Sequence, residues 1–177
     1  LHTRYLLIGD DFRFGAKRTG DFAQLAACPV FETQAMSTIS LLGERISSSR
    51  IRHALAEGDF AHAQALLGRS YQISGHVMHG KKLGRTLGYP TANVHLPHRR
   101  PALNGVFVVE ADTPFGTLGG VASLGLNPTV ESDDRYKLEV HLFDFNGNLY
   151  GTRMAVRFLA KLRDEQKFDS LAALTAQ

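Results

Sequence analysis

The densest chemical signal in the sequence is the segment 80–93. Three glycines at four-residue spacing alternate with three cations: Gly80, Lys81, Lys82, Gly84, Arg85 and Gly88. Glycines at this spacing let backbone amides adopt positive φ and approach a ligand closely. Cations among such N–H donors suit the phosphates of a ligand. The segment is not a Walker A loop, because no Gly-Lys-Ser/Thr closes it and no long helix follows.

Two oxygen-bearing side chains stand at the end of this segment. Pro90 stiffens the chain, and Thr91 and Asn93 follow on alternate residues, so an extended backbone points both side chains the same way. A hydroxyl and an amide oxygen suit a magnesium ion that keeps most of its waters. The alternative interpretation is a glycine-rich hairpin whose lysines are merely solvated.

A carboxylate on a predicted strand at 137–145 is the second candidate element. Leu138, Val140 and Leu142 form its buried face, which places Glu139 on the other face with Lys137 and His141. Transfer of a phosphoryl group to an alcohol benefits from a base that orients or deprotonates the hydroxyl. The alternative is an exposed glutamate paired with a neighbouring cation.

A third candidate lies at the start of a predicted helix. The run Ile46-Ser47-Ser48-Ser49-Arg50-Ile51-Arg52 supplies serine caps, and its free helix N–H groups and arginines favour an anion. An ordinary capped helix is the alternative.

The elements that must position these residues change character along the chain. The first part reads as α/β, with strands at 5–8 and 30–36, a helix at 21–27, and a helical pair from about 47 to 67. After Gly68 the apolar residues alternate, which predicts strands at 71–78, 105–110, 117–123, 137–145 and 153–158. Short strands with few helices favour an antiparallel barrel, followed by a helix at 169–177.

The second part of the chain, about residues 70 to 177, resembles the riboflavin kinases. The motifs that carry the resemblance are Gly84-Arg85-x-Leu87-Gly88-x-Pro90-Thr91-Ala92-Asn93, Asn104-Gly105-Val106-Phe107, Leu138-Glu139-Val140-His141 and Leu162-Arg163-Asp164-Glu165-x-Lys167-Phe168. The resemblance implies a six-stranded Greek-key barrel that phosphorylates riboflavin to FMN with MgATP. It also implies that Thr91 and Asn93 hold magnesium and phosphate and that Glu139 is the catalytic base. Arg163 and Phe168 are weaker candidates for the flavin side.

The first part resembles the later half of the adenylyltransferase domain of bacterial bifunctional FAD synthetases. The matching residues include Asp11 and Phe12 in a flavin-side loop, and Ser47, Ser48, Ser49 and Arg52 in a phosphate-binding motif. The expected architecture is therefore α+β, with a partial nucleotidyltransferase (Rossmann-like) domain at 1–68 and a kinase domain at 69–177. The chain starts at Leu1 and lacks the family's His-x-Gly-His-type motif, so we expect a fragment with little FAD synthetase activity. A full-length parent would carry out both steps.

Composition agrees with a soluble globular protein that binds small molecules. The net charge is +3, and 17 acidic residues are interspersed with 20 basic ones, so we expect no nucleic-acid partner. No apolar run approaches a membrane span, and the single cysteine, Cys28, fits a reducing cytoplasm. The expected ligands are riboflavin, ATP and Mg²⁺, with FMN and FAD as products, and the oligomeric state is left open. A flavin- or nucleotide-binding barrel without catalysis is the alternative function.

Overall fold

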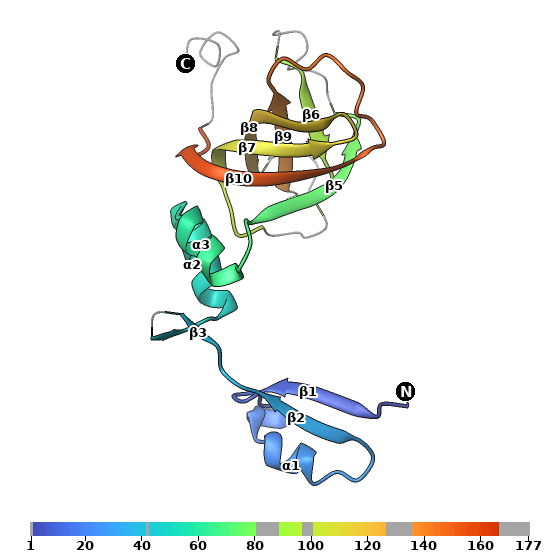
Figure 1. Ribbon diagram of the computed structural model, residues 1–177, viewed down its shortest axis with the longest axis vertical. Coiled ribbons are helices and arrows are strands. Elements are labelled where there is room, and N and C mark those ends of the chain that lie inside the picture. Colours follow the sequence, from blue (N-terminus) through green and yellow to red (C-terminus); the bar gives the residue numbers. More distant parts are fainter. Residues whose placement is uncertain (1, 42, 81–88, 97–100, 127–135, 167–177) are drawn as a thin grey trace. The chain divides into compact units, whose positions relative to one another are not determined.

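The computed structural model describes residues 2–41, 43–80, 89–96, 101–126 and 136–166. The chain divides into two compact units, Leu1–Ser47 and Ser48–Gln177 (Figure 1). No helix among the described residues is both long and apolar enough to span a lipid bilayer.

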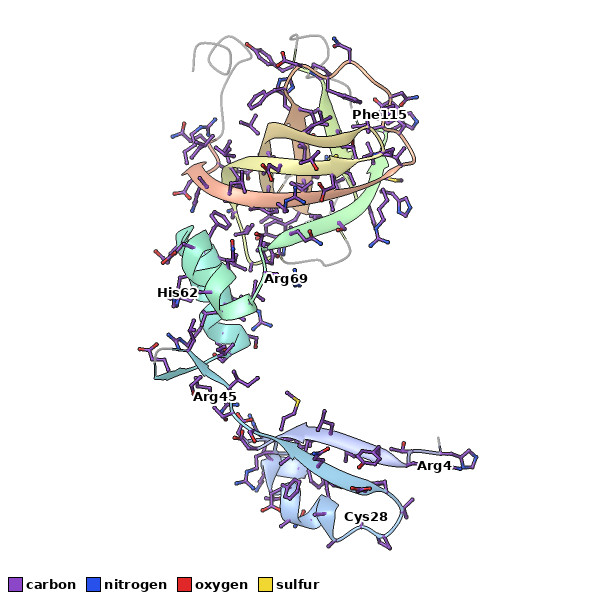
Figure 2. The ribbon with its side chains drawn as sticks, in the orientation of Figure 1. Arg4, Cys28, Arg45, His62, Arg69 and Phe115 are labelled. Atoms are coloured by element: carbon purple, nitrogen blue, oxygen red, sulfur yellow. The ribbon has the colours of Figure 1, made fainter. Side chains whose placement is uncertain are left out.

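The first unit is a small α/β arrangement. Strands β1 (Tyr5–Gly9) and β2 (Glu32–Met36) pair in parallel. The connection between them contains the short helices η1 (Ala16–Arg18) and α1 (Phe22–Ala26). Asp21 caps α1 by accepting a hydrogen bond from the Gln24 amide, at 3.2 Å. A two-stranded ribbon, β3 (Ser40–Leu41) and β4 (Glu44–Arg45), follows. Cys28, labelled in Figure 2, lies after α1 with a free thiol.

The second unit opens with two helices, α2 (Ser48–Glu57) and α3 (Phe60–Leu67). Asp59 caps α3 through the His62 amide at 2.9 Å, and Gly68 ends it at φ 70°, the left-handed conformation that favours glycine. The Phe60 ring stands edge-on to Phe107, with ring centroids 6.0 Å apart. The helical pair therefore belongs to the same compact unit as the barrel, and the division between the two units falls after Ser47.

Six strands close into a barrel: β5 (Gln72–Met78), β6 (Thr91–Val94), β7 (Gly105–Thr113), β8 (Gly116–Leu126), β9 (Tyr136–Leu142) and β10 (Arg153–Arg163). Their order around the barrel is β10-β5-β6-β9-β8-β7, and every neighbouring pair is antiparallel. β7, β8 and β9 form a meander, and β10 returns beside β7, which is Greek-key connectivity. The predicted antiparallel six-stranded barrel is confirmed.

The barrel interior follows from the alternating apolar residues. Along β9, Leu138 and Val140 are almost completely buried, while Glu139 between them is exposed. Along β7, Phe107, Val109 and Ala111 face the same core. Apolar side chains therefore fix which face of each strand is turned outward, and with it the position of every polar side chain considered below.

The strands extend beyond some predicted limits. β8 runs to Leu126. β10 runs to Arg163, because register shifts between Phe158 and Ala160 and between Lys161 and Arg163 let this strand keep its pairing with β7. β9 ends at Leu142, three residues earlier than predicted. The predicted helix at 169–177 lies outside the described residues.

Candidate active site

A row of paired residues on the outer face of the barrel carries the predicted chemistry. Asn93 on β6 is the direct Cα partner of Glu139 on β9, and Glu139 is in turn the partner of Ser123 on β8. Because directly paired residues in a sheet share a face, all three side chains emerge on the side opposite the buried Leu138 and Val140. The structure thus brings together Asn93 and Glu139, which are far apart in the sequence.

A second row lies two residues farther along the same strands. Thr91 pairs with His141, and His141 pairs with Val121 of β8. Thr91 therefore shares its face with Asn93, as the alternation of side chains predicts. A hydroxyl, a side-chain amide, a carboxylate and an imidazole thus lie within a two-strand patch, and rigid paired strands hold their backbones.

The beginning of the glycine-rich segment contacts this patch. A Cβ added to Gly80 would lie 2.2 Å from Nδ2 of Asn93, so the glycine backbone lies directly against the Asn93 amide. Any larger residue at position 80 would displace that amide. The remaining predicted phosphate-binding residues, Lys81, Gly84, Arg85 and Gly88, lie outside the described residues.

A cavity of about 570 Å³ opens next to Thr91. The strands β5, β6 and β9 contribute apolar lining from Val77, Ala92 and Val140, and the connection between β9 and β10 contributes polar lining, including Asn146 and Asn148. The cavity is large enough for a planar heterocycle with part of its sugar. Among the predicted site residues that the structure describes, Thr91 lines it and Glu139 does not.

One wall of this cavity joins the glycine-rich segment. Tyr150 lines the cavity, and its ring lies 4.0 Å, centroid to centroid, from the ring of His79. His79 immediately precedes Gly80. The aromatic contact therefore ties the start of that segment to the connection between β9 and β10.

The far end of the Glu139 row holds Arg163 from the C-terminal motif. Arg163, a predicted flavin-side residue, pairs with Val106, which pairs with Ser123, so Arg163 lies on the same row as Glu139. Its guanidinium donates to the Asp164 carbonyl at 3.1 Å. The second flavin-side candidate, Phe168, lies outside the described residues.

Sequence reasoning did not assign a role to Ser123 or Glu165. The Ser123 hydroxyl donates to Oε1 of Glu165 at 2.9 Å, and Oε2 of Glu165 occupies the space where a Cβ of residue 125 would be, 1.6 Å from it. Gly125 thus leaves room for this carboxylate. Glu165 lies two residues after the end of β10 and far from Gly125 in the sequence, so no local pattern indicates this contact.

A group of ion pairs on the barrel lies outside this patch. Arg157 of β10 binds Asp112 and, at 3.2 Å, Glu110, both on β7. The hydrogen bond from Arg157, followed by that from the Thr117 hydroxyl, lowers the pKa of Asp112 below its ordinary value. These contacts join neighbouring strands and stabilise the barrel rather than the candidate site.

The residues predicted for the adenylyltransferase remnant fall in two units. Asp11 and Phe12 belong to the first unit, where Arg45 contacts Asp11 at 2.8 Å and lowers the pKa of that carboxyl. Ser48, Ser49 and Arg52 belong to the second unit and lie on the first turns of α2. Ser47 immediately precedes that helix.

The donor set of the patch fits a magnesium ion held mainly by substrate. The described residues contain no cluster of three or more His, Cys, Asp or Glu side chains that could hold a metal ion. Thr91 and Asn93 offer two neutral oxygens on one face, with one carboxylate beside them. Such a sparse set suits Mg²⁺, which is usually bound through one or two protein oxygens, water and phosphates.

Comparisons with known proteins agree with this geometry. The family model described as riboflavin kinase matches residues 67–177. A bifunctional riboflavin kinase/FMN adenylyltransferase of Pseudomonas fluorescens is 49% identical, with 98% of this chain and 57% of that protein covered. Its counterpart in Escherichia coli (strain K12) is 45% identical, with 100% of this chain and 58% of that protein covered. This chain thus spans little more than half the length of these relatives.

A solved structure also matches across both units. The crystal structure described as a macrolide-efflux protein from Streptococcus pneumoniae is 35% identical, with a TM-score of 0.71. The match covers 96% of this chain and 56% of that one.

Proposed function

The chain belongs to the riboflavin kinase family, and on this premise we propose that it transfers the γ-phosphoryl group of ATP to the terminal ribityl hydroxyl of riboflavin, forming FMN and ADP. The observation that carries the proposal is the direct pairing of Asn93 with Glu139. This pairing supports the proposal because it brings the candidate phosphate-side ligand next to the candidate base. A binding module without catalysis would have no need of both residues.

Glu139 acts on the nucleophile in this mechanism. Its carboxylate accepts the proton of the ribityl hydroxyl as the hydroxyl oxygen forms a bond to the γ-phosphorus. The bond between that phosphorus and the β,γ-bridging oxygen breaks, and ADP leaves. The paired strand β9 fixes the backbone of Glu139 beside Asn93, which supports the alignment that in-line transfer requires.

Thr91 and Asn93 act on the phosphate side. Both would hold Mg²⁺ and the phosphates through their side-chain oxygens, and the bound ion would neutralise charge on the transferring group. Gly80 lets the backbone approach the Asn93 amide closely, which supports a role for the segment 80–88 in covering the phosphates.

The cavity beside Thr91 is our candidate site for the base and ribose of ATP. Thr91 lines it and Glu139 does not, so the nucleotide would approach from one side of the patch and the flavin from the other. Arg163, on the row of Glu139, would then lie on the flavin side.

The comparisons suggest an origin for residues 1–66. Bifunctional relatives match nearly the whole chain, while the family model begins at residue 67. We propose that this first part derives from an FMN adenylyltransferase domain with the domain boundary near residue 68, and that the longer parent acts in the cytoplasm on both reactions. The 177-residue chain itself is expected to carry out the kinase step alone.

The test is a chromatographic assay of the purified chain. Incubation with riboflavin, ATP and Mg²⁺ should yield FMN, and incubation with FMN, ATP and Mg²⁺ should yield little FAD. Absence of FMN, with riboflavin still bound, would favour the non-catalytic barrel instead.

A further inference from the structure

His141 lies next to the candidate site, and the proposed reaction assigns it no role. It lies on β9, two residues after Glu139, and is the direct Cα partner of Thr91. Its Nδ1 lies 3.0 Å from the carbonyl oxygen of Pro90. A carbonyl oxygen only accepts, so this hydrogen bond requires the proton on Nδ1.

The ring is held in this position from two sides. Tyr89 approaches it at 5.5 Å between centroids, with the ring planes 75° apart, and Phe143 at 6.0 Å, with the planes 78° apart. Edge-to-face contacts of this kind favour one ring orientation. The imidazole is therefore placed to keep Nδ1 aimed at the Pro90 carbonyl.

A hydrogen bond to the Pro90 carbonyl can fix the orientation of the peptide that joins Pro90 to Thr91. Pro90 stands just before β6, which begins at Thr91, and has no N–H with which to extend the strand ladder. Its carbonyl belongs to the same planar peptide unit as the Thr91 amide nitrogen. A bond from His141 to that oxygen therefore sets the plane from which Thr91 projects.

We propose that His141 is a positioning residue that fixes the Pro90–Thr91 peptide, and with it the Thr91 hydroxyl, through the Nδ1–H bond to Pro90. The inference rests on the proposed function, because it assigns Thr91 the role of ligand to the metal and the phosphate. The imidazole itself contacts neither substrate in this proposal.

Two amide substitutions separate this role from a general structural one. In His141→Asn the side-chain amide nitrogen falls close to the position of Nδ1 and can still donate to Pro90. In His141→Gln the amide lies farther out, near the position of Nε2, and the donor is lost. The matched controls are His76→Asn and His76→Gln, because His76 is an exposed histidine of the same barrel, on β5.

Three measurements apply to each variant. They are the KM and kcat of the riboflavin kinase reaction, the dissociation constant of Mn²⁺–ADP by calorimetry, and hydrogen exchange of a peptide covering residues 89–96. We expect His141→Gln to raise the KM for the nucleotide and the dissociation constant about three- to tenfold, as expected for one lost hydrogen bond. Exchange in the peptide should become faster. His141→Asn should stay within about twofold of the wild type, and both His76 variants should be unchanged.

Equal behaviour of His141→Asn and His141→Gln, whether both normal or both impaired, would overturn the inference, because the Nδ1 donor would then not matter. Unchanged exchange of the 89–96 peptide in His141→Gln would overturn it as well. A wild-type chain that makes no FMN would instead overturn the proposed function. Calorimetry and hydrogen exchange would still decide whether His141 orders Thr91.

Discussion

Asn93 and Glu139 face each other across β6 and β9, as direct partners on the outer surface of a closed barrel. The buried neighbours Val94 and Leu138, which form the next pair along the same two strands, point inward. The polar pair is thus held in place by the packing of the apolar pair. The following predictions test how far activity and stability depend on such pairings.

Replacement of Glu139 by Gln should lower kcat at least about a hundredfold, the low end of a general base's usual contribution. The amide keeps the size of the side chain but does not accept the proton. Riboflavin binding, measured by flavin fluorescence, should change little. Lys137→Gln is the matched control, because Lys137 lies on the same face of β9 and should leave kcat unchanged. A near-normal rate for Glu139→Gln would remove this residue from the mechanism.

Replacement of Gly80 by Ala should disturb the Asn93 amide, because the new Cβ would lie 2.2 Å from its Nδ2 atom. We expect kcat/KM for MgATP to fall roughly tenfold, the equivalent of one hydrogen bond to a charged group. Thermal unfolding should change little, since a side chain rather than the backbone has to move. Gly119→Ala is the control, because among the described residues its added Cβ would meet Phe143 alone, at an ordinary contact distance of 3.8 Å. Equal activities of the two variants would contradict the prediction.

Replacement of Gly125 by Ala should expel the Glu165 carboxylate, whose Oε2 lies 1.6 Å from the added Cβ. The loss of the exposed Ser123–Glu165 hydrogen bond should lower the free energy of unfolding by at most about 1 kcal/mol. Urea denaturation of Gly125→Ala, Glu165→Ala and the double variant forms a complete cycle. Because both changes remove one interaction, the double variant should lose no more than either single variant. Additive losses would show that the two residues act separately.

The Asp112–Arg157 pair should make the stability of the barrel depend on pH in the acid range. The pKa of Asp112 is lowered in the folded protein, chiefly by Arg157, so the folded state favours its charged form. This stabilisation is fully present above the ordinary aspartate pKa of about 4 and is lost as pH falls through the lowered value. The difference in unfolding free energy between the wild type and Asp112→Asn should therefore shrink in acid. A difference that persists unchanged at low pH would argue against the ion pair as its source.

Much of the fold could be predicted from local patterns. Alternation of apolar residues located five of the six barrel strands, and Gly68 marked the end of α3. β6 was predicted only as extended backbone around Thr91 and Asn93. Its four residues are too few to establish a period, and its pairing with β9 comes from tertiary structure. The packing of Phe60 against Phe107 is likewise a long-range contact without a local signal.

The candidate site could be predicted in its residue types but not in its neighbours. Thr91, Asn93 and Glu139 were found because each stands on an alternating strand pattern or beside glycine and proline. The hydrogen bond from His141 to Pro90 and the place of Glu165 over Gly125 depend on which strands lie side by side. That arrangement follows from the Greek-key order rather than from any single segment.

The pairing register of β9 also determines which of its side chains face outward and which face the core. A slip of one residue would turn Glu139 into the barrel and expose Leu138, Val140 and Leu142 to water. Burial of each such side chain is worth about 1.5–3 kcal/mol, so the misregistered strand is strongly disfavoured. Packing of the apolar core thus also determines that Glu139 faces outward on the candidate site.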